Sequence, residues 1–536
     1  MRKMIGALLA CAVLTLCCGT MAAAVETQDA YVTYEEHGAA GDGVTDDFAA
    51  IIAAHTDANA RSLPVRANDS AVYYIGDVPG TAVVKTDTDW GSAKFVIDDR
   101  ALSSGAVGRY VFQVASSHAA IPITTVSRMQ KDQDKLDITL PQDCLVAVTD
   151  STALRFIRRG ADQNAGTAQM DVFIVDQNGV LDPDVPLMWD YENVTSMTAY
   201  PIDEERLSVR GGHFTTIANG EAGRAYYERG IGVTRSNVEL SGITHAITGE
   251  GAEGSPYNGF VHLQDCANVT VRGSLFSGHK PYAKPLDTDT LIGKIENEFS
   301  LRGTYDIRLD RAVNAQFINC GQLNDILDRD LWGIMSSNFS KNVTFDGCEL
   351  SRFDAHMGIY NAAIKNSTIG CYGITVTGFG LLLIENSTLQ SGSLVNLRYD
   401  YGSFWDGEIV IRNCVFEPFA GRGGTLADKL GNFLRGGSLV SSINDGQWDF
   451  GYPCMMPEKI TVDGLTINDR NHPVLYFGPR IFDHLSYTFG FKAETYPYLK
   501  TREVTVKDVK AESIWCLKKN KPWTLWLLRD TKVEWL

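Results

Sequence analysis

No stretch long enough to cross a membrane follows the first residues of this 536-residue sequence. The one marked apolar run, Met4–Cys18, is shorter than the about 20 residues that a transmembrane helix needs, and it follows Arg2 and Lys3 directly. Small alanines come next, in the order typical of a secretory signal peptide. We expect a signal peptide over residues 1–24 and a secreted or periplasmic mature protein. A lipid anchor through Cys17 or Cys18 is the alternative.

Positive charge and metal-binding motifs are also scarce. Lys and Arg number 48 against 65 Asp and Glu, which gives a formal net charge of −17. Such an acidic chain repels nucleic acid, so no nucleic-acid partner is expected. The sequence has no CxxC pair and no His/Cys cluster with zinc spacing. We therefore predict no metal site and no cofactor. Three of the eleven cysteines precede residue 19 and the others are scattered, which does not indicate a disulfide scaffold.

Short β-rich segments with one shared pattern recur from about residue 230 onward. In each, alternating apolar residues lead to a pivot residue, a small residue follows, and a second alternating stretch begins. Several repeats are about 19 to 31 residues apart, the length of one β-helix coil. Asn and Gly suit a left-handed bend between two strands. The pivots are Gly242, Gly273, Asn319, Gly347, Asn366, Asn386, Asn413, Gly464 and Asp508.

This pattern predicts an all-β fold, a right-handed parallel β-helix (solenoid) over residues 203–536 with a closing segment at its C-terminus. Residues 25–83 are expected to form an N-terminal cap and the first β-helix segment. Between them, over residues 84–202, the coil pattern disappears. Segments such as KFVIDDR and MDVFIVD predict strands of a small inserted β-rich module, which we expect to be antiparallel.

Small residues directly after the pivots predict a ladder inside the solenoid. Equivalent positions of stacked coils lie about 4.8 Å apart. We expect buried, free thiols that pack as small apolar groups, with a disulfide as the alternative. The ladder positions are Cys320, Cys348 and Cys414, matched in other coils by Ser274, Ser367 and Ser387.

The segment GDGVTDD at 41–47, followed by a helical pattern over 48–58, resembles the opening segment of the pectate lyase superfamily. In that superfamily the turn starts a short amphipathic helix that plugs the N-terminal end of a right-handed β-helix. The resemblance implies this fold, and it implies capping roles rather than chemistry for Asp42, Asp46 and Asp47. The superfamily includes polysaccharide-degrading enzymes, but also tailspikes and surface proteins of unassigned activity.

Charged and apolar residues alternate in several of the repeats, which places the charged side chains together on an outer strand face. In SRFDAHMG, Arg352, Asp354 and His356 alternate with apolar residues predicted to point inward. A coil of about 22 residues would align Asp354 with Arg308, Asp330 and Arg398 in one row. Such a row is long enough to contact several sugar rings.

A lyase acting on a uronic-acid glycan by β-elimination is the function that this row favours. The reaction needs a base, a cation for the substrate carboxylate and a proton donor for the leaving oxygen. His356 is the candidate base, and Asp354 is expected to orient it and raise its basicity. Arg352 is the candidate cation and Tyr372 the candidate acid. The predicted substrate-binding residues are Arg308, Asp328, Asp330, Trp332, Tyr360, Arg398, Asp400 and Trp405.

Other functions remain open at this point. A glycoside hydrolase needs two carboxylates, which Asp328, Asp330 and Asp354 could provide. The ordered motifs of the polygalacturonase branch are absent, and no residue set matches the calcium ligands of pectate lyases, so a calcium site is unsupported. Exposed Arg and Asp side chains also form solvated ion pairs of little energy. A glycan-binding or surface protein without catalysis is therefore a further alternative.

Overall fold

The computed structural model describes residues 30–102, 109–158, 166–220, 226–251, 257–280, 282–283, 301–302, 305–332, 335–418, 437–444, 448–469, 479–486, 497–519 and 530–536. The predicted signal peptide lies outside these residues. None of the helices within them combines the length and apolar character needed to cross a membrane.

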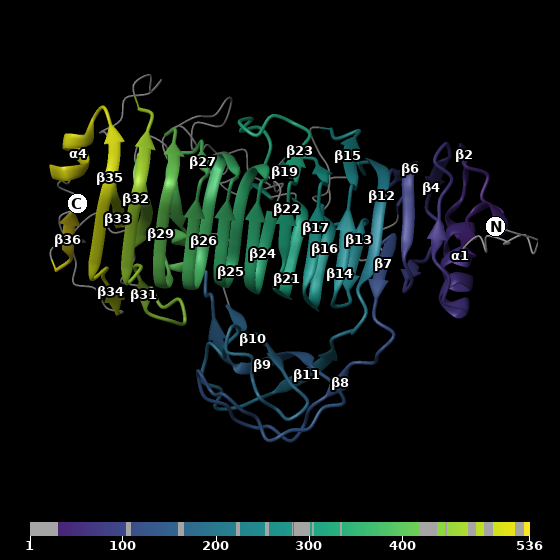
Figure 1. The fold of residues 1–536 in the computed structure, drawn as a ribbon, viewed down its shortest axis with the longest axis horizontal. Coiled ribbons are helices and arrows are strands. Elements are labelled where there is room, and N and C mark those ends of the chain that lie inside the picture. Colours follow the sequence, from purple (N-terminus) through teal and green to yellow (C-terminus); the bar gives the residue numbers. More distant parts are fainter. Residues whose placement is uncertain are drawn as a thin grey trace, which may run out of the picture.

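A parallel β-helix forms the body of the molecule, with its coils stacked along the long axis in Figure 1. Within the described residues, one array of 28 strands makes up the coils, and its strand pairs are parallel, as where β24 lies between β21 and β25. The predicted fold class is therefore confirmed.

The array begins with the strands β1 (Val32–Thr33), β2 (Asp42–Asp46), β3 (Val65–Arg66), β4 (Val72–Ile75), β5 (Ala82–Val84), β6 (Thr88–Asp98) and β7 (Phe112–Ala115). It continues with β12 (Leu207–Ile217), β13 (Ile231–Thr234), β14 (Val238–Ser241), β15 (Thr244–Thr248), β16 (Asn258–Ala267), β17 (Val269–Arg272), β18 (Leu275–Phe276), β21 (Tyr305–Val313), β22 (Gln316–Ile318), β23 (Gly321–Gln322), β24 (Met335–Asp346), β25 (Glu349–Lys365), β26 (Thr368–Glu385), β27 (Thr388–Leu389), β28 (Ser393–Leu397), β29 (Trp405–Phe416), β30 (Ser438–Asn444), β32 (Lys459–Ile467), β33 (Arg480–Ser486), β35 (Glu503–Ala511) and β36 (Lys532–Trp535). Outside the array lie η1 (Glu35–His37), η3 (Tyr399–Tyr401), the strand pairs β19 (Tyr282–Ala283) with β20 (Leu301–Arg302) and β31 (Cys454–Met455) with β34 (Tyr498–Leu499), and α4 (Ile514–Lys519) near the C-terminal end.

Left-handed bends turn each coil, and every predicted pivot has one. The φ angles of these pivots lie between 49° and 76°. A second set of bends, not predicted, is formed by asparagines whose side chains bond one another from coil to coil at 3.0–3.2 Å. This asparagine ladder consists of Asn237, Asn268, Asn314, Asn342 and Asn361, with φ between 54° and 58°.

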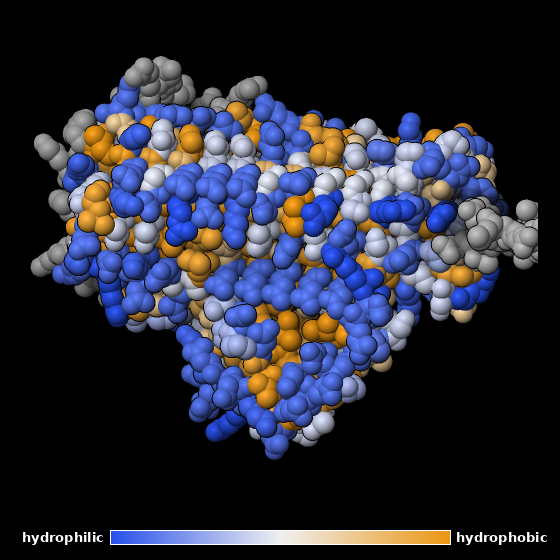
Figure 2. Space-filling view, viewed as in Figure 1, coloured by the Kyte–Doolittle hydropathy of each residue, from blue (hydrophilic) through white to orange (hydrophobic). Residues whose placement is uncertain are grey.

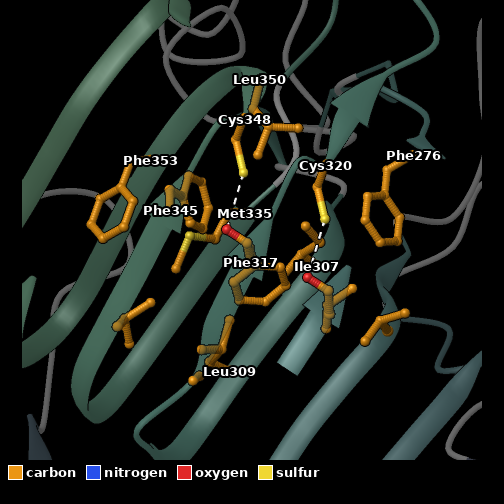
Figure 3. Close-up of a cluster of buried hydrophobic side chains, with 14 of the residues drawn as sticks. Phe276, Ile307, Leu309, Phe317, Cys320, Met335, Phe345, Cys348, Leu350 and Phe353 are labelled. Atoms are coloured by element: carbon orange, nitrogen blue, oxygen red, sulfur yellow. Dashed lines mark hydrogen bonds between the residues drawn. The ribbon is translucent and has the colours of Figure 1, made fainter. Parts of the chain in front are cut away.

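Apolar side chains from successive coils fill the interior (Figure 3). The rings of Phe317, Phe345 and Phe353 follow one another at centroid distances of 5.2 and 5.0 Å. Beside them Cys320 and Cys348 are buried, and the thiol of Cys348 lies 3.2 Å from the carbonyl oxygen of Phe317. The predicted ladder of small residues is present, and its cysteines are free.

The helix α1 (Phe48–Arg61) closes the N-terminal end (Figure 1). Asp46 accepts a hydrogen bond from the amide of Phe48, the first helical residue, at 3.0 Å. Asp47 accepts two amides of the preceding loop, and Asp42 accepts those of Val44 and Thr45. All three aspartates of the GDGVTDD segment therefore stabilise the turn and the helix start, as the resemblance implied.

A small antiparallel module projects from one side of the solenoid (Figure 1). It contains β8 (Ile121–Pro122), β9 (Cys144–Arg155), β10 (Thr167–Val175) and β11 (Ser196–Pro201), in the order β10-β9-β11-β8. The predicted start at residue 84 is wrong, because β6 pairs in parallel with β12, and β7 with β13. Apolar and polar residues alternate in β6 and β7 as they do in the strands of the module, but β6 and β7 belong to coils of the solenoid.

Buried contacts attach the module to the solenoid. Lys341 of β24 lies 2.8 Å from Asp171 of β10, and both side chains are almost fully buried. The neighbouring ladder residue Asn342 donates to the carbonyl of Asp184 at 3.1 Å. Phe156, beyond β9, packs edge-on against Phe339 of β24. The module is therefore fixed at the asparagine bend of the β24 coil.

Replacement of Gly347 by valine is expected to destabilise the solenoid. At its φ of 67°, a β-branched residue is strained, and a Cβ atom would lie 2.3 Å from the side-chain oxygen of Asn319. We expect thermal unfolding to show a clearly lower melting temperature for Gly347→Val. Gly220→Val is the matched control, because no atom of the described residues lies within 4 Å of a Cβ built there. Equal melting temperatures for both variants would contradict the assigned bend.

Candidate functional site

Asp354, on the outer side of β25, is the centre of a charged network. Its carboxylate is completely buried and lies 2.7 Å from Nη2 of Arg352, 3.0 Å from Nη1 of Arg398 and 3.1 Å from Nε2 of His356. Phe353 and Ala355, between these positions, point into the solenoid core. The strand alternation predicted for this segment is confirmed up to Ala355. We call Arg352, Asp354, His356, Arg398 and Asp400 the Asp354 cluster.

Arg398 connects the two carboxylates of the cluster. It donates two hydrogen bonds to Asp400, at 3.2 and 2.9 Å, as well as the one to Asp354. Arg158, from beyond β9, contacts Asp400 at 2.8 Å. Burial works against the charge on Asp400, but Arg398 and Arg158 outweigh it and hold the pKa of this carboxyl well below its usual range. Arg398 was predicted to bind substrate, but its guanidinium is already occupied by these carboxylates.

Arg352 has unused hydrogen-bonding capacity. Its guanidinium is within 5.0 Å of the ring centre of Trp332 and 5.8 Å of that of Tyr372. Nη2 contacts Asp354, while the buried Nε and Nη1 atoms have no hydrogen-bond partner among the residues that the structure describes. A buried guanidinium that lacks partners is costly. Nε and Nη1 lie on different edges of the guanidinium, so an acceptor such as a carboxylate oxygen would satisfy one of them at a time.

His356 is uncharged at neutral pH, contrary to one expectation. We predicted that Asp354 would raise its basicity. Instead burial lowers the pKa of the imidazole well below its usual value, and the positive charges of Arg398 and Arg352 lower it further. A neutral ring that donates Nε2–H to the adjacent carboxylate keeps its basic lone pair on Nδ1. About a fifth of the side chain (21%) is exposed.

The row that the coil spacing predicted differs from the observed one. Asp354 pairs with Thr375 of β26, which in turn pairs with Asn396 of β28. Arg398 lies two residues beyond that row and reaches Asp354 diagonally. Asp328 and Asp330 lie in a turn outside the strands, where Asp328 accepts the amide of Asp330. The expected alignment of Asp330 with Asp354 is therefore wrong.

Arg308 belongs to a separate network. It bonds Asp310, which also accepts hydrogen bonds from His262 at 2.8 Å and from Asn338 at 2.7 Å. His262 in turn contacts the hydroxyl of Tyr110. These groups are ion-paired among themselves on the outer side of β16 and β21, so Arg308 is not part of the Asp354 cluster.

Two of the predicted aromatic residues lie elsewhere. Trp405 is fully buried in the solenoid core, where its Nε1–H donates to the carbonyl of Gly380 at 3.2 Å. Its assignment to a sugar-binding surface is wrong. Tyr360 follows the bend at Gly358 and packs near Lys341, 5.9 Å from its ammonium group. It therefore lies beside the module and not in the cluster. Met357, predicted to point inward, packs beside the module as well.

The hydroxyls of two tyrosines border the cluster. Tyr372, the predicted acid, donates to the carbonyl of Arg329 at 2.7 Å and so holds the 325–332 turn. Tyr305 was not singled out from the sequence, yet its hydroxyl lies 3.4 Å from Nε2 of His356. Burial raises the pKa of Tyr305 well above its usual value, which keeps it a proton donor. Its place opposite His356 depends on coil register, which the sequence did not reveal.

A polar groove lies beside the asparagine ladder, on the strands that follow the asparagine bends. It has a volume of about 440 Å³ and is lined by four ladder residues, by Arg206 and by outward side chains of β17, β22 and β24. Thr270, Gln316 and Thr344 occupy equivalent positions in these three strands. Figure 2 shows hydrophilic residues in a continuous band along the border between solenoid and module. Amide and hydroxyl groups in such a row can bond sugar hydroxyls.

Comparison with known proteins gives distant similarities. No family model matches the chain. A capsule KL64-specific depolymerase of Klebsiella phage P510 is 28% identical over 96 residues, which are 15% of this chain and 9% of that protein. The matched segment is thus a small part of the phage protein.

Solved structures with a similar course of the chain include phage tailspikes and an adhesin. The tailspike of Pseudomonas phage phi297 matches with 13% identity and a TM-score of 0.49, covering 90% of this chain and 81% of the tailspike. The surface protein and adhesin PfbA of Streptococcus pneumoniae matches with 12% identity and a TM-score of 0.39, covering 95% and 96%.

Substitution of Asp354 by asparagine is expected to destabilise the protein. Loss of the carboxylate leaves the buried guanidinium groups of Arg352 and Arg398 without one of their counter-charges, and breaking a buried pair costs about 3–5 kcal/mol. Chemical denaturation should show this loss. The control is Asp330→Asn, in an exposed turn, where we expect a change below about 1 kcal/mol. Equal stability of both variants would contradict the central role of Asp354.

Proposed function

We propose that this protein is an exported enzyme that cleaves a uronic-acid-containing polysaccharide by β-elimination at the Asp354 cluster. The observation that carries the proposal is the pairing of a neutral histidine with an unsatisfied guanidinium. Arg352 Nη2 and His356 Nε2 contact the same carboxylate oxygen, at 2.7 and 3.1 Å. A uronate carboxylate on Arg352 would therefore bring its neighbouring carbon close to the imidazole.

The reaction then proceeds with a balanced transfer of protons. His356 removes the proton from C5 of the uronate, and Arg352 stabilises the negative charge that develops on the carboxylate. The electron pair forms a double bond between C4 and C5, and the C4–O bond breaks. The phenol of Tyr305 protonates the leaving oxygen. Tyr372 does not take this role, because its hydroxyl already donates to the backbone carbonyl of Arg329.

Three further observations support an exported glycan-degrading protein. The sequence begins with the charged, apolar and small-residue order of a signal peptide. The segment shared with the phage depolymerase is 28% identical over 96 residues, and the GDGVTDD turn resembles that of the pectate lyase superfamily. The hydrolase alternative is weaker, because Asp354 is bound to Arg352 and Arg398, while Asp328 and Asp330 lie in a turn outside the strands.

Glycan binding without cleavage is the second candidate function. The polar groove favours it, since its lining offers amides, hydroxyls and the guanidinium of Arg206. Affinity electrophoresis through a polysaccharide gel separates the two candidates. If binding in the groove is the function, Gln316→Trp should abolish retardation of the protein, while no product appears with any polysaccharide.

Loss of either reacting group is expected to reduce cleavage strongly without unfolding the protein. On a panel of uronic-acid and neutral polysaccharides, the wild type should generate ultraviolet-absorbing unsaturated uronates. His356→Ala should lower turnover by about 100-fold or more, the usual contribution of a general base. Arg352→Ala should also weaken substrate binding. His213→Ala and Arg272→Ala, at exposed positions, are the controls. New reducing ends without ultraviolet absorbance would refute elimination.

The pH dependence of cleavage follows from the lowered pKa of His356. The base acts in its neutral form, and protonation on acidification removes it. Because the pKa lies well below the ordinary value of about 6.5, kcat/KM should stay constant from neutral pH to below pH 6.5 before it falls. Initial rates between pH 4 and 8 would show at which pH kcat/KM begins to fall. A half-maximal point at or above pH 6.5 would exclude His356 as the base.

A further inference from the structure

A second group of ionisable side chains lies inside the solenoid, where the proposed reaction does not use it. His245 of β15, His279 beyond β18 and Asp306 of β21 are all buried. His245 pairs in register with the core residue Phe214, and its ring stacks on Phe260 at 3.8 Å. The sequence separates these residues too widely for a metal motif, but the coils bring them together.

One nitrogen of each imidazole converges on the same carboxylate. Nε2 of His279 lies 2.6 Å from Oδ1 of Asp306, and Nδ1 of His245 lies 2.8 Å from both carboxylate oxygens. The potential ligand atoms all lie within 4.8 Å of one another. Two nitrogens and one carboxylate oxygen are the donor set of many zinc sites.

In metal sites, the atom of a ligand residue that faces away from the ion usually contacts a further polar group, which fixes the orientation of the ligand. The three residues have contacts of this kind. Nε2 of His245 is 2.9 Å from the hydroxyl of Thr216. Oδ2 of Asp306 accepts the amide of Ser277 at 2.7 Å. Nδ1 of His279 is buried, has no hydrogen bond to any residue that the structure describes, and faces a carboxylate oxygen of Glu250 at 3.7 Å. A small shift of His279 would form a carboxylate–histidine–metal contact.

We propose that His245, His279 and Asp306 bind a divalent transition-metal ion, with zinc the best match. Once the ion has displaced the proton of His279, two neutral imidazoles, the carboxylates of Asp306 and Glu250 and a dication sum to zero charge, as a buried site requires. Tetrahedral zinc with nitrogen ligands at 2.0–2.1 Å separates its ligand atoms by about 3.3 Å. The contacts of 2.6 and 2.8 Å between the imidazoles and Asp306 must therefore widen by about 0.5–0.7 Å.

The burial of the site assigns the ion a structural role. With almost no exposed surface on its ligands, the ion does not reach a polysaccharide. It connects the coils of β15, β18 and β21 from within. Asp306 is the neighbour of Tyr305, the proposed proton donor, in β21. An ion bound to Asp306 would therefore help to fix the strand that positions Tyr305. The inference is independent of the proposed reaction.

The test uses the mature protein, stripped with a chelator and then dialysed against zinc. Elemental analysis should find about one zinc per chain, and zinc should raise the melting temperature by a few degrees. His245→Asn and His279→Asn should each lose the bound zinc and the thermal shift, while His213→Ala, at an exposed site, keeps both.

X-ray absorption of the zinc-loaded wild type provides a measurement that does not depend on folding of the variants. It should show nitrogen and oxygen neighbours at about 2.0–2.1 Å. The proposal is overturned if the equilibrated wild type holds no stoichiometric zinc and shows no thermal shift. It is also overturned if a folded His245→Asn/His279→Asn double variant retains the ion.

Discussion

Hydrogen bonding between successive parallel coils is the constraint on which the rest of the structure depends. Strands at about 4.8 Å spacing place each side chain directly against its equivalents in the next coil. The asparagine ladder, the phenylalanine rings and the small residues beside Cys320 are all consequences of this spacing. On the outer side, the same rule gathers charges from separate coils around Asp354. Core and candidate site thus share one geometric origin.

Local backbone rules were sufficient to predict the fold, whereas coil length limited the prediction of the site. The pivots could be predicted because a left-handed bend selects Gly, Asn or Asp wherever it occurs. The row containing Asp354 could not, because loops of unequal length separate the strands. Asp330 is in such a loop, and Ser336 takes the position opposite Arg308. Trp405 was assigned wrongly because the occurrence of an aromatic residue in these coils does not reveal whether its side chain points into the core.

The state of the candidate site depends on residues that are distant in the sequence. Alternation placed Arg352, Asp354 and His356 together correctly. It did not predict the lowered pKa of His356, because that shift requires burial and the positive charge of Arg398. Nor did it reveal the internal pair of histidines, which meet Asp306 only after the coils stack. A sequence pattern identifies which residues share a strand; their electrostatics are set by neighbouring coils.

The position of the module has a consequence for how the chain folds. In most solenoids each coil meets only the preceding one, and folding can spread in one dimension. Here β6 must pair with β12, and β7 with β13, although the whole inserted module separates them in the sequence. Closing so long a loop delays these contacts. The junction between the N-terminal coils and the remainder is therefore the expected slow step, and a shorter connection in place of the module would make it faster.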